Sequence, residues 1–424
     1  MSLGAFIQFA VVFTDNYFVA ELDGKAMSAV SYIGLAYVTL IMITTGISSA
    51  VQIIIARRNG ENQYAAIPSI LHNALYLSII IACIQFILLY FITPIILTRI
   101  IDDTHIIQYM NEFITYRSWG FWFYTPTLML QGYWTGIAST RPVLFTMLIT
   151  SITNIILDYF LVLGVGVFPK WGVGGAAIAT LIAEMAAFFF LAIYTFRQRP
   201  ILSKIKWQWL RSIQTQLLQL GLPIVFQMLI ALGVWMTFYT LVENRGAPSL
   251  QSAFIVRNMY MLCWVSVMGF SAATRTYIST LIAEDAQGKI NATIWKLIGF
   301  NLIGVLLLSH GLWLYPHWIA AQFTDDPIVI ELAVKSMTII LPAILIYCFT
   351  SILLAVVEGS GYTMAGFWIE LFTSFGYLSF IFWAVYCTDW EAPLLWTSDY
   401  VYFILIGIGS GFFLWYYPWR RKVI

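Results

Sequence analysis

Charged residues are scarce in this sequence. Only 10% of its 424 residues are charged, and 61% are hydrophobic, whereas soluble domains carry about 25% charged residues. A chain with so little charge lacks the polar surface that water requires. Apolar segments of roughly 20 residues, the length that crosses a bilayer, recur along the chain. We therefore interpret it as an integral membrane protein surrounded by a lipid bilayer.

Other scarcities exclude further classes of protein. The net charge of +1 offers no basic excess for a nucleic-acid partner. The four cysteines and four histidines have no metal-ligand spacing. The sequence also lacks the pairing of a nucleophile with a neighbouring base that would indicate an enzyme. The glycine-rich stretch 172–177 lacks the Lys-Ser/Thr of a phosphate loop. It favours close helix packing instead, and we expect no cofactor and no resident metal.

Twelve apolar segments predict transmembrane helices. They cover residues 1–20, 29–55, 67–98, 106–132, 143–166, 173–196, 212–242, 249–282, 291–315, 327–357, 364–388 and 394–418. The only long polar stretch, 197–211, divides them six and six. The sequence thus predicts an all-α membrane protein with an N-terminal six-helix bundle at 1–196. A cytoplasmic basic linker at 197–211 and a C-terminal six-helix bundle at 212–424 complete it.

An internal repeat supports this division. At one constant offset along the sequence, similar residues recur in three places: Gly46 and Gly269, Asp102-Asp103 and Asp325-Asp326, and Gly136 and Gly359. Because each half has an even number of helices, both halves enter the membrane in the same direction. We expect a pseudo-twofold axis along the membrane normal, which is typical of transporters built from parallel repeats.

The lysines and arginines of the loops predict the orientation. If the N-terminus is cytoplasmic, twelve lie inside and four outside. The inner set is Arg57, Arg58, Arg141, Arg197, Arg199, Lys204, Lys206, Arg211, Lys289, Arg420, Arg421 and Lys422, and the outer set is Lys25, Arg99, Lys170 and Arg245. We expect a multi-pass protein of the cell (inner) membrane with both termini cytoplasmic.

A few ionisable residues lie at membrane depth, where they usually face a cavity or one another. Asp15 and Gln8 share one face of the first helix, and Asn154 and Asp158 share one face of the fifth. The two faces could converge on a pocket for a proton or Na⁺, because carboxylates supply hard oxygen ligands and can share a proton. For most of the other intramembrane charges we expect interhelical salt bridges or side chains that snorkel to the membrane surface, and we expect Glu331 to pair with Lys335. These other charges are Glu112, Arg117, Glu184, Arg257, Arg275, Glu331, Lys335 and Glu370, of which Glu331 and Lys335 have i,i+4 spacing.

Four stretches resemble the multidrug and toxic compound extrusion (MATE) family of cation-coupled exporters. They are Thr14-Asp15-Asn16-Tyr17-Phe18-Val19-Ala20 with Gly24, Gly46-Ile47-Ser48-Ser49-Ala50, Asn154-x-x-Leu157-Asp158 followed by Gly172-Val173-x-Gly175-Ala176-Ala177-Ile178-Ala179-Thr180, and Gly221-Leu222-Pro223. The resemblance implies a V-shaped, alternating-access exporter. It implies that Asp15, Asn154 and Asp158 carry cation coupling, with Gln8 and Thr180 as neighbours in the pocket.

The sequence departs from the family pattern in its second half. Tyr362 stands where an aspartate is common, which separates the chain from the typical drug-efflux subgroup. Ala231 and Tyr347 stand near the positions where members with a C-terminal coupling site have acidic residues. A coupling site in the C-terminal bundle is therefore not expected.

Our first hypothesis is a monomeric antiporter that exports small organic compounds, cationic or amphipathic, in exchange for H⁺ or Na⁺. The alternative keeps the fold but moves a lipid-linked or polar metabolite.

Overall fold

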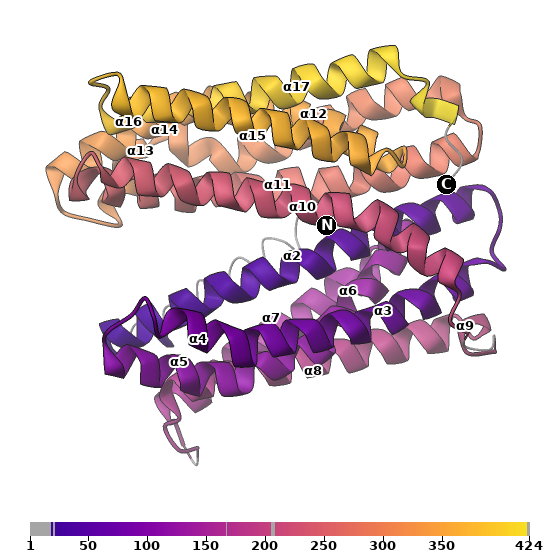
Figure 1. Ribbon diagram of the computed structural model, residues 1–424, viewed down its shortest axis with the longest axis horizontal. Helices are drawn as coiled ribbons and strands as arrows, with labels where there is room; N and C mark the ends of the chain where they lie inside the picture. The colour runs from indigo at the N-terminus through magenta and orange to yellow at the C-terminus, as the bar shows by residue number, and fades with distance from the viewer. Residues whose placement is uncertain (1–17, 20–21, 167, 205–207, 422–424) are drawn as a thin grey trace. The chain divides into compact units, whose positions relative to one another are not determined.

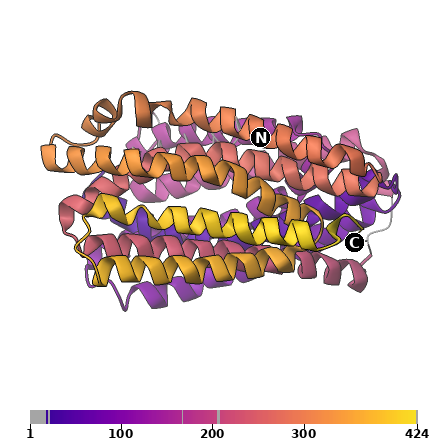
Figure 2. The same cartoon turned by 90° about the horizontal axis from the view of Figure 1, so that it is seen from above.

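The protein is helical wherever its structure, a computed structural model, describes the chain, namely residues 18–19, 22–166, 168–204 and 208–421. No strand occurs in these ranges. Within each half of the chain the long helices run alongside one another (Figure 1, Figure 2). Helices satisfy their backbone hydrogen bonds internally, which a bilayer demands.

Local signals set the helix boundaries of the first half. Asp23 begins the first long helix by accepting a hydrogen bond from the backbone N–H of Ala26 at 2.6 Å. Pro68 and Pro142 lie in first turns, where a missing N–H costs nothing. The elements are α2 (Gly24–Gly60), α3 (Ile67–Ile87), η1 (Leu88–Ile92), α4 (Thr93–Leu97), α5 (Thr104–Arg117), η2 (Ser118–Gly120), α6 (Phe121–Gly136), α7 (Arg141–Leu163) and α8 (Gly172–Gln198).

The second half begins with a short helix and continues with long ones. Gly246 precedes α11 with φ +98°, a backbone conformation that suits glycine. The elements are α9 (Ile201–Lys204), α10 (Arg211–Glu243), α11 (Ala247–Ala283), α12 (Gln287–Leu314), α13 (Pro316–Ala321), α14 (Pro327–Gly359), α15 (Thr363–Tyr386), α16 (Ala392–Leu395), α17 (Ser398–Tyr416) and η3 (Trp419–Arg421).

The predicted membrane spans correspond to these helices. Ten helices among the described residues are long and apolar enough to cross a membrane. The run α5–η2–α6 is helical from Thr104 to Gly136 and is also of spanning length. Eleven predicted spans therefore coincide with helices. The predicted span 1–20 lies outside the described residues, except for Phe18 and Val19.

The internal repeat is visible in the packing. Asp103 caps α5, and its repeat equivalent Asp326 caps α14, each through its side-chain oxygen. Gly136 approaches Gln52 of α2, where an added Cβ would lie 2.9 Å from the backbone oxygen. Gly359 approaches Arg275 of α11 in the same way, with 2.8 Å to its Cα. Since Gln52 and Arg275 are separated by the same offset as the two glycines, the repeat extends to helix contacts that the sequence comparison did not use.

The chain divides into two compact units, Leu3–Val225 and Phe226–Ile424, which we call the N-terminal and C-terminal units. The division falls inside α10 because the beginning of this helix packs on α2 and α3. An added Cβ on Gly221 would lie 3.0 Å from the Cα of Ile47. Gln214 donates hydrogen bonds to the backbone and side-chain oxygens of Asn73 at 2.9 and 3.1 Å. The linker predicted at 197–211 thus ends where α10 begins, and its place as the bundle boundary stays a prediction.

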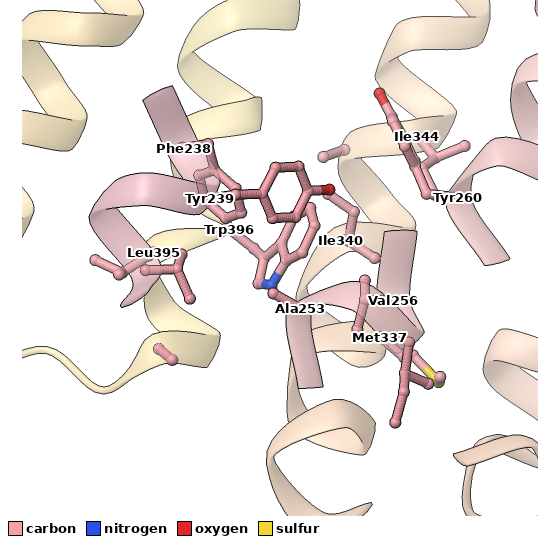
Figure 3. Packing of buried hydrophobic residues seen from close by; sticks show 14 of the residues in the cluster. Phe238, Tyr239, Ala253, Val256, Tyr260, Met337, Ile340, Ile344, Leu395 and Trp396 are labelled. Carbon is pink, nitrogen blue, oxygen red and sulfur yellow. The ribbon is translucent and has the colours of Figure 1, made fainter. Parts of the chain in front are cut away.

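Aromatic and aliphatic side chains form the core of the C-terminal unit (Figure 3). Phe238 packs on Trp396 with ring centroids 4.6 Å apart. Val256 of α11 and Ile340 of α14 are fully buried in the same cluster. This core holds α10, α11 and α14 together around the end of α16.

Candidate functional site

The predicted polar face of α7 packs against α8. Asn154 and Asp158 lie one turn apart on α7, and both are fully buried. The side-chain amide of Asn154 donates a hydrogen bond to the Thr180 hydroxyl of α8 at 3.3 Å. Thr180 in turn donates to the backbone oxygen of Ala176 at 2.9 Å. The structure thus joins Asn154 with Thr180 and places Asp158 one helical turn away.

Small residues allow this close approach of α7 and α8. An added Cβ on Gly175 would lie 2.6 Å from the backbone oxygen of Leu161, so only glycine fits there without a backbone shift. Glu112 of α5 accepts a hydrogen bond from the backbone N–H of Gly174 at 3.0 Å and stabilises the positive end of α8. The stretch 172–177 therefore serves helix packing, as the sequence predicts.

The face offers oxygen atoms to a cation. The hydrogen of the Thr180 hydroxyl is used by Ala176, so this hydroxyl acts as an acceptor toward Asn154. The side-chain oxygen of Asn154 is buried and accepts no hydrogen bond within the described part of the chain. Asp158 adds a carboxylate on the same face. Amide and carboxylate oxygens are hard ligands that suit Na⁺, and the carboxylate can also take a proton.

Two predicted members of this site, Gln8 and Asp15, lie outside the described residues. Whether the first helix closes the pocket from the other side therefore stays a prediction. No group of three or more metal-ligating side chains occurs in the ranges that the structure describes.

Arg117 and Glu184 form a second buried polar cluster in the N-terminal unit. The guanidinium donates two hydrogen bonds to the carboxylate, at 2.9 and 3.0 Å. The Tyr37 hydroxyl donates to the same carboxylate at 3.1 Å, and the guanidinium lies 3.5 Å from the centre of the Tyr37 ring. This is the interhelical salt bridge that the sequence predicts, joining α2, α5 and α8.

The C-terminal unit has two further predicted ion pairs. Arg275 binds Glu358 at 2.8 Å, between α11 and α14. Lys335 binds Glu331 at 2.9 Å on the exposed surface of α14. Both pairs confirm the expectation for these charges.

For Glu370 the expected salt bridge is wrong. This buried carboxylate accepts hydrogen bonds from the hydroxyls of Tyr402 and, at 3.4 Å, of Ser374, and it has no ion pair among the described residues. The i,i+4 spacing of Ser374 is a signal that the sequence contains. The contact with Tyr402, which belongs to another helix, depends on how α15 and α17 pack.

Arg257 also differs from the expectation of a salt bridge. Its guanidinium lies among three aromatic rings of α10 and α11, and no carboxylate pairs with it in the described part of the chain. The sequence contains no local signal for this arrangement.

The profile of the MatE family matches residues 1–160 and 223–383, one stretch in each half of the chain. The chain belongs to the MatE family. This is the MATE family that the four sequence stretches resemble. The probable multidrug resistance protein NorM of Idiomarina loihiensis is 24% identical over 330 residues, which cover 76% of this chain and 71% of the relative. The FAD transporter of Shewanella oneidensis is 23% identical over 328 residues, 75% of this chain and 71% of the relative.

A solved structure confirms the fold of this MatE family member. A transporter of the MOP superfamily from Pyrococcus furiosus, described as having a binding pocket of reversed polarity, matches with a TM-score of 0.92 and 18% identity. The match covers 100% of this chain and 95% of the other. The predicted fold of twelve transmembrane helices in two bundles is therefore confirmed. The protein is a multi-pass membrane transporter of small molecules, not an enzyme.

Proposed function

We propose that this MatE transporter is an antiporter that exports small organic compounds, cationic or amphipathic, in exchange for H⁺ or Na⁺. The carrying observation is the buried α7–α8 face. On it the Asn154 amide oxygen accepts no hydrogen bond from the described residues, and Asp158 lies one turn away. A buried amide oxygen without a donor costs roughly 1–3 kcal/mol. A cation that coordinates this oxygen and the carboxylate offsets that cost.

Cation binding at this face gives a reason for conformational change. In our proposal the cation enters from outside and binds Asp158, Asn154 and the predicted partner Asp15, with Gln8 and Thr180 beside them. The first helix then repacks, and the transporter shifts toward the state that releases substrate outward. A ligand shifts such an equilibrium only by its difference in affinity between the two states. The site must therefore be better formed in one state than in the other.

The alternative is export of a lipid-linked or polar metabolite. Phosphate-bearing cargo is usually held by several free arginines. Arg117 and Arg275 are each paired with a glutamate, which leaves neither free to bind phosphate. The pairing of these two arginines favours the first proposal, although Arg257 has no carboxylate partner in the described ranges. The FAD transporter of Shewanella oneidensis is the observation that keeps a polar metabolite as the second candidate.

We further propose that the protein is a monomer in the inner membrane, with both termini cytoplasmic. The support for the orientation is the excess of lysine and arginine in the loops that this topology places inside.

Gradient-driven efflux from proteoliposomes tests the antiport proposal. Ethidium is loaded, and an H⁺ or a Na⁺ gradient is imposed separately. We expect Asp158→Asn, which keeps the side-chain shape but not the charge, to decrease the export rate about tenfold or more, the scale of a typical coupling free energy. The gradient that drives the wild-type protein identifies the ion.

The matched control is Asp103→Asn, which removes a carboxylate of the same unit. The Asp103 carboxylate lies at the surface, where it binds Lys25 at 2.8 Å. This variant should export at the wild-type rate. Full transport by Asp158→Asn would exclude the proposed site. If neither gradient drives ethidium export in the wild-type protein, the cationic cargo is wrong and the polar metabolite becomes the first candidate.

A further inference from the structure

Arg257 of α11 lies in an aromatic surround in the C-terminal unit. Its guanidinium carbon is 4.9 Å from the ring centre of Phe254 and 5.8 Å from those of Trp235 and Tyr239. Two of these rings come from α10 and one from α11. Phe254 is exposed and Arg257 is half-buried, so this group lies at the edge of the C-terminal unit's core. Aromatic faces stabilise a cation but leave its N–H donors unused.

The guanidinium of Arg257 has no hydrogen-bond or ion-pair partner among the residues that the structure describes. Its Nε is buried and makes no hydrogen bond, and no carboxylate lies within ion-pair distance of Arg257 in the described ranges. Arg117 of α5 and Arg275, further along α11, each bind a glutamate. An intramembrane charge is costly and is usually paired. The missing partner of Arg257 therefore points to one that comes from outside the chain.

A second donor points to the same place. The Tyr239 side chain is only 7% exposed, and its O–H donates no hydrogen bond to the described residues. Its ring stacks on Phe254 with centroids 5.6 Å apart. In Figure 3 this ring lies beside Trp396 with the hydroxyl directed away from Phe238. The side chain is thus held firmly while its O–H remains unused.

The neighbouring acidic residue does not fill this role. Asp399 of α17 is close enough to Tyr239 to interact electrostatically. It forms no ion pair with Arg257 and accepts no hydrogen bond from Tyr239. The two unused donors and the aromatic rings form one group, which we call the Arg257 site: Arg257, Tyr239, Trp235 and Phe254.

We propose that the Arg257 site binds the acidic group of a substrate that also carries a planar ring system. A guanidinium and a phenol O–H can both donate to one carboxylate. The flanking aromatic rings provide flat apolar contact for the body of the molecule. The Arg257 proposal rests on the proposed export of organic compounds. It narrows the class of exported substrate from cationic or amphipathic compounds to amphipathic molecules with an anionic group.

Two dyes that differ in one group test this proposal. Rhodamine 110 carries a free carboxylate, and rhodamine 123 is its methyl ester. Both are titrated against the full-length protein in nanodiscs of neutral lipid, with fluorescence anisotropy as the measurement. We expect the wild-type protein to bind rhodamine 110 about tenfold more tightly than rhodamine 123, the scale of a charge-assisted hydrogen bond. Because no ion gradient is present, the result does not depend on Asp158 or on antiport.

Three variants assign the preference to the site. Arg257→Gln should abolish the preference for rhodamine 110. Arg257→Lys should keep part of this preference, because lysine retains the charge but loses the planar donor pair. Tyr239→Phe should decrease it by about threefold. The control is Lys335→Gln, which removes a cation from the exposed surface of the same unit and should keep the wild-type ratio.

An anionic lipid headgroup is the other source of the same chemistry. A second set of nanodiscs containing phosphatidylglycerol separates the two. Equal preference in both lipid mixtures supports a substrate site, whereas loss of the preference with phosphatidylglycerol assigns the site to lipid and overturns the proposal. Equal binding of both dyes, binding of neither, or an unchanged ratio in Arg257→Gln also overturns it. Failure of gradient-driven efflux, by contrast, concerns only the antiport proposal.

Discussion

At the scale of residues, the partner of each intramembrane charge indicates its role. Arg117 and Arg275 are held by glutamates and link helices. Glu370 is held by hydroxyls. Asp158 belongs to the α7 face that we propose for cation coupling, and Arg257 lies among aromatic rings. Similar side chains thus have different chemistry because their neighbours differ.

Removing one member of a buried ion pair should destabilise the protein strongly. Glu184→Gln leaves the guanidinium of Arg117 without its countercharge. We expect a loss of about 3–5 kcal/mol of folding free energy, because the remaining charge stays buried and unpaired. The measurement is Tm in detergent by intrinsic fluorescence.

The comparison is Glu331→Gln, which breaks the exposed pair with Lys335. Its Tm should remain close to that of the wild type, since solvent screens such pairs. Similar Tm values for the two variants would show that the Arg117–Glu184 pair does not stabilise the fold.

At the scale of elements, glycines set the distance between helices. Gly136 and Gly359 occupy equivalent positions in the repeat and each approaches the backbone of another helix. A methyl group at either position has no room unless the helices separate. Membrane helices gain stability from close packing because lipid offers no hydrophobic drive for their association.

We expect Gly359→Ala and Gly136→Ala each to destabilise the protein by about 1–3 kcal/mol, the usual effect of overpacking. Gly299→Ala is the control, because a Cβ there meets nothing within 4 Å and alanine favours the helix. Its Tm should equal or exceed that of the wild type. A wild-type Tm for Gly359→Ala would contradict the packing argument.

At the scale of the whole molecule, the proposed orientation places the end of α15 outside the cell. Cys387 follows α15 and is exposed, whereas Cys263 and Cys348 are buried. Cys83 is exposed along α3 in the middle of a membrane span. Since Cys83 lies within a span that we expect to cross the bilayer, a charged reagent should not reach it.

A membrane-impermeant maleimide should therefore label intact spheroplasts at Cys387 alone. Cys387→Ser should remove the labelling, which mass spectrometry of the purified protein would verify. Labelling that requires permeabilised membranes would reverse the proposed orientation and place both termini outside.

The sequence by itself determined the membrane class, the helix positions, the helix caps and the repeat, because each depends on residues close together or at a constant offset. Asp103 and Asp326, which the repeat aligns, each cap a helix, and the i,i+4 spacing of Asn154 and Asp158 sets their common face.

Only the tertiary structure decided which groups meet across helices. The hydrogen bond from Asn154 to Thr180, the hydroxyls around Glu370 and the aromatic rings around Arg257 depend on how neighbouring helices rotate and cross. Periodicity defines the face that a helix presents but not the helix that it meets.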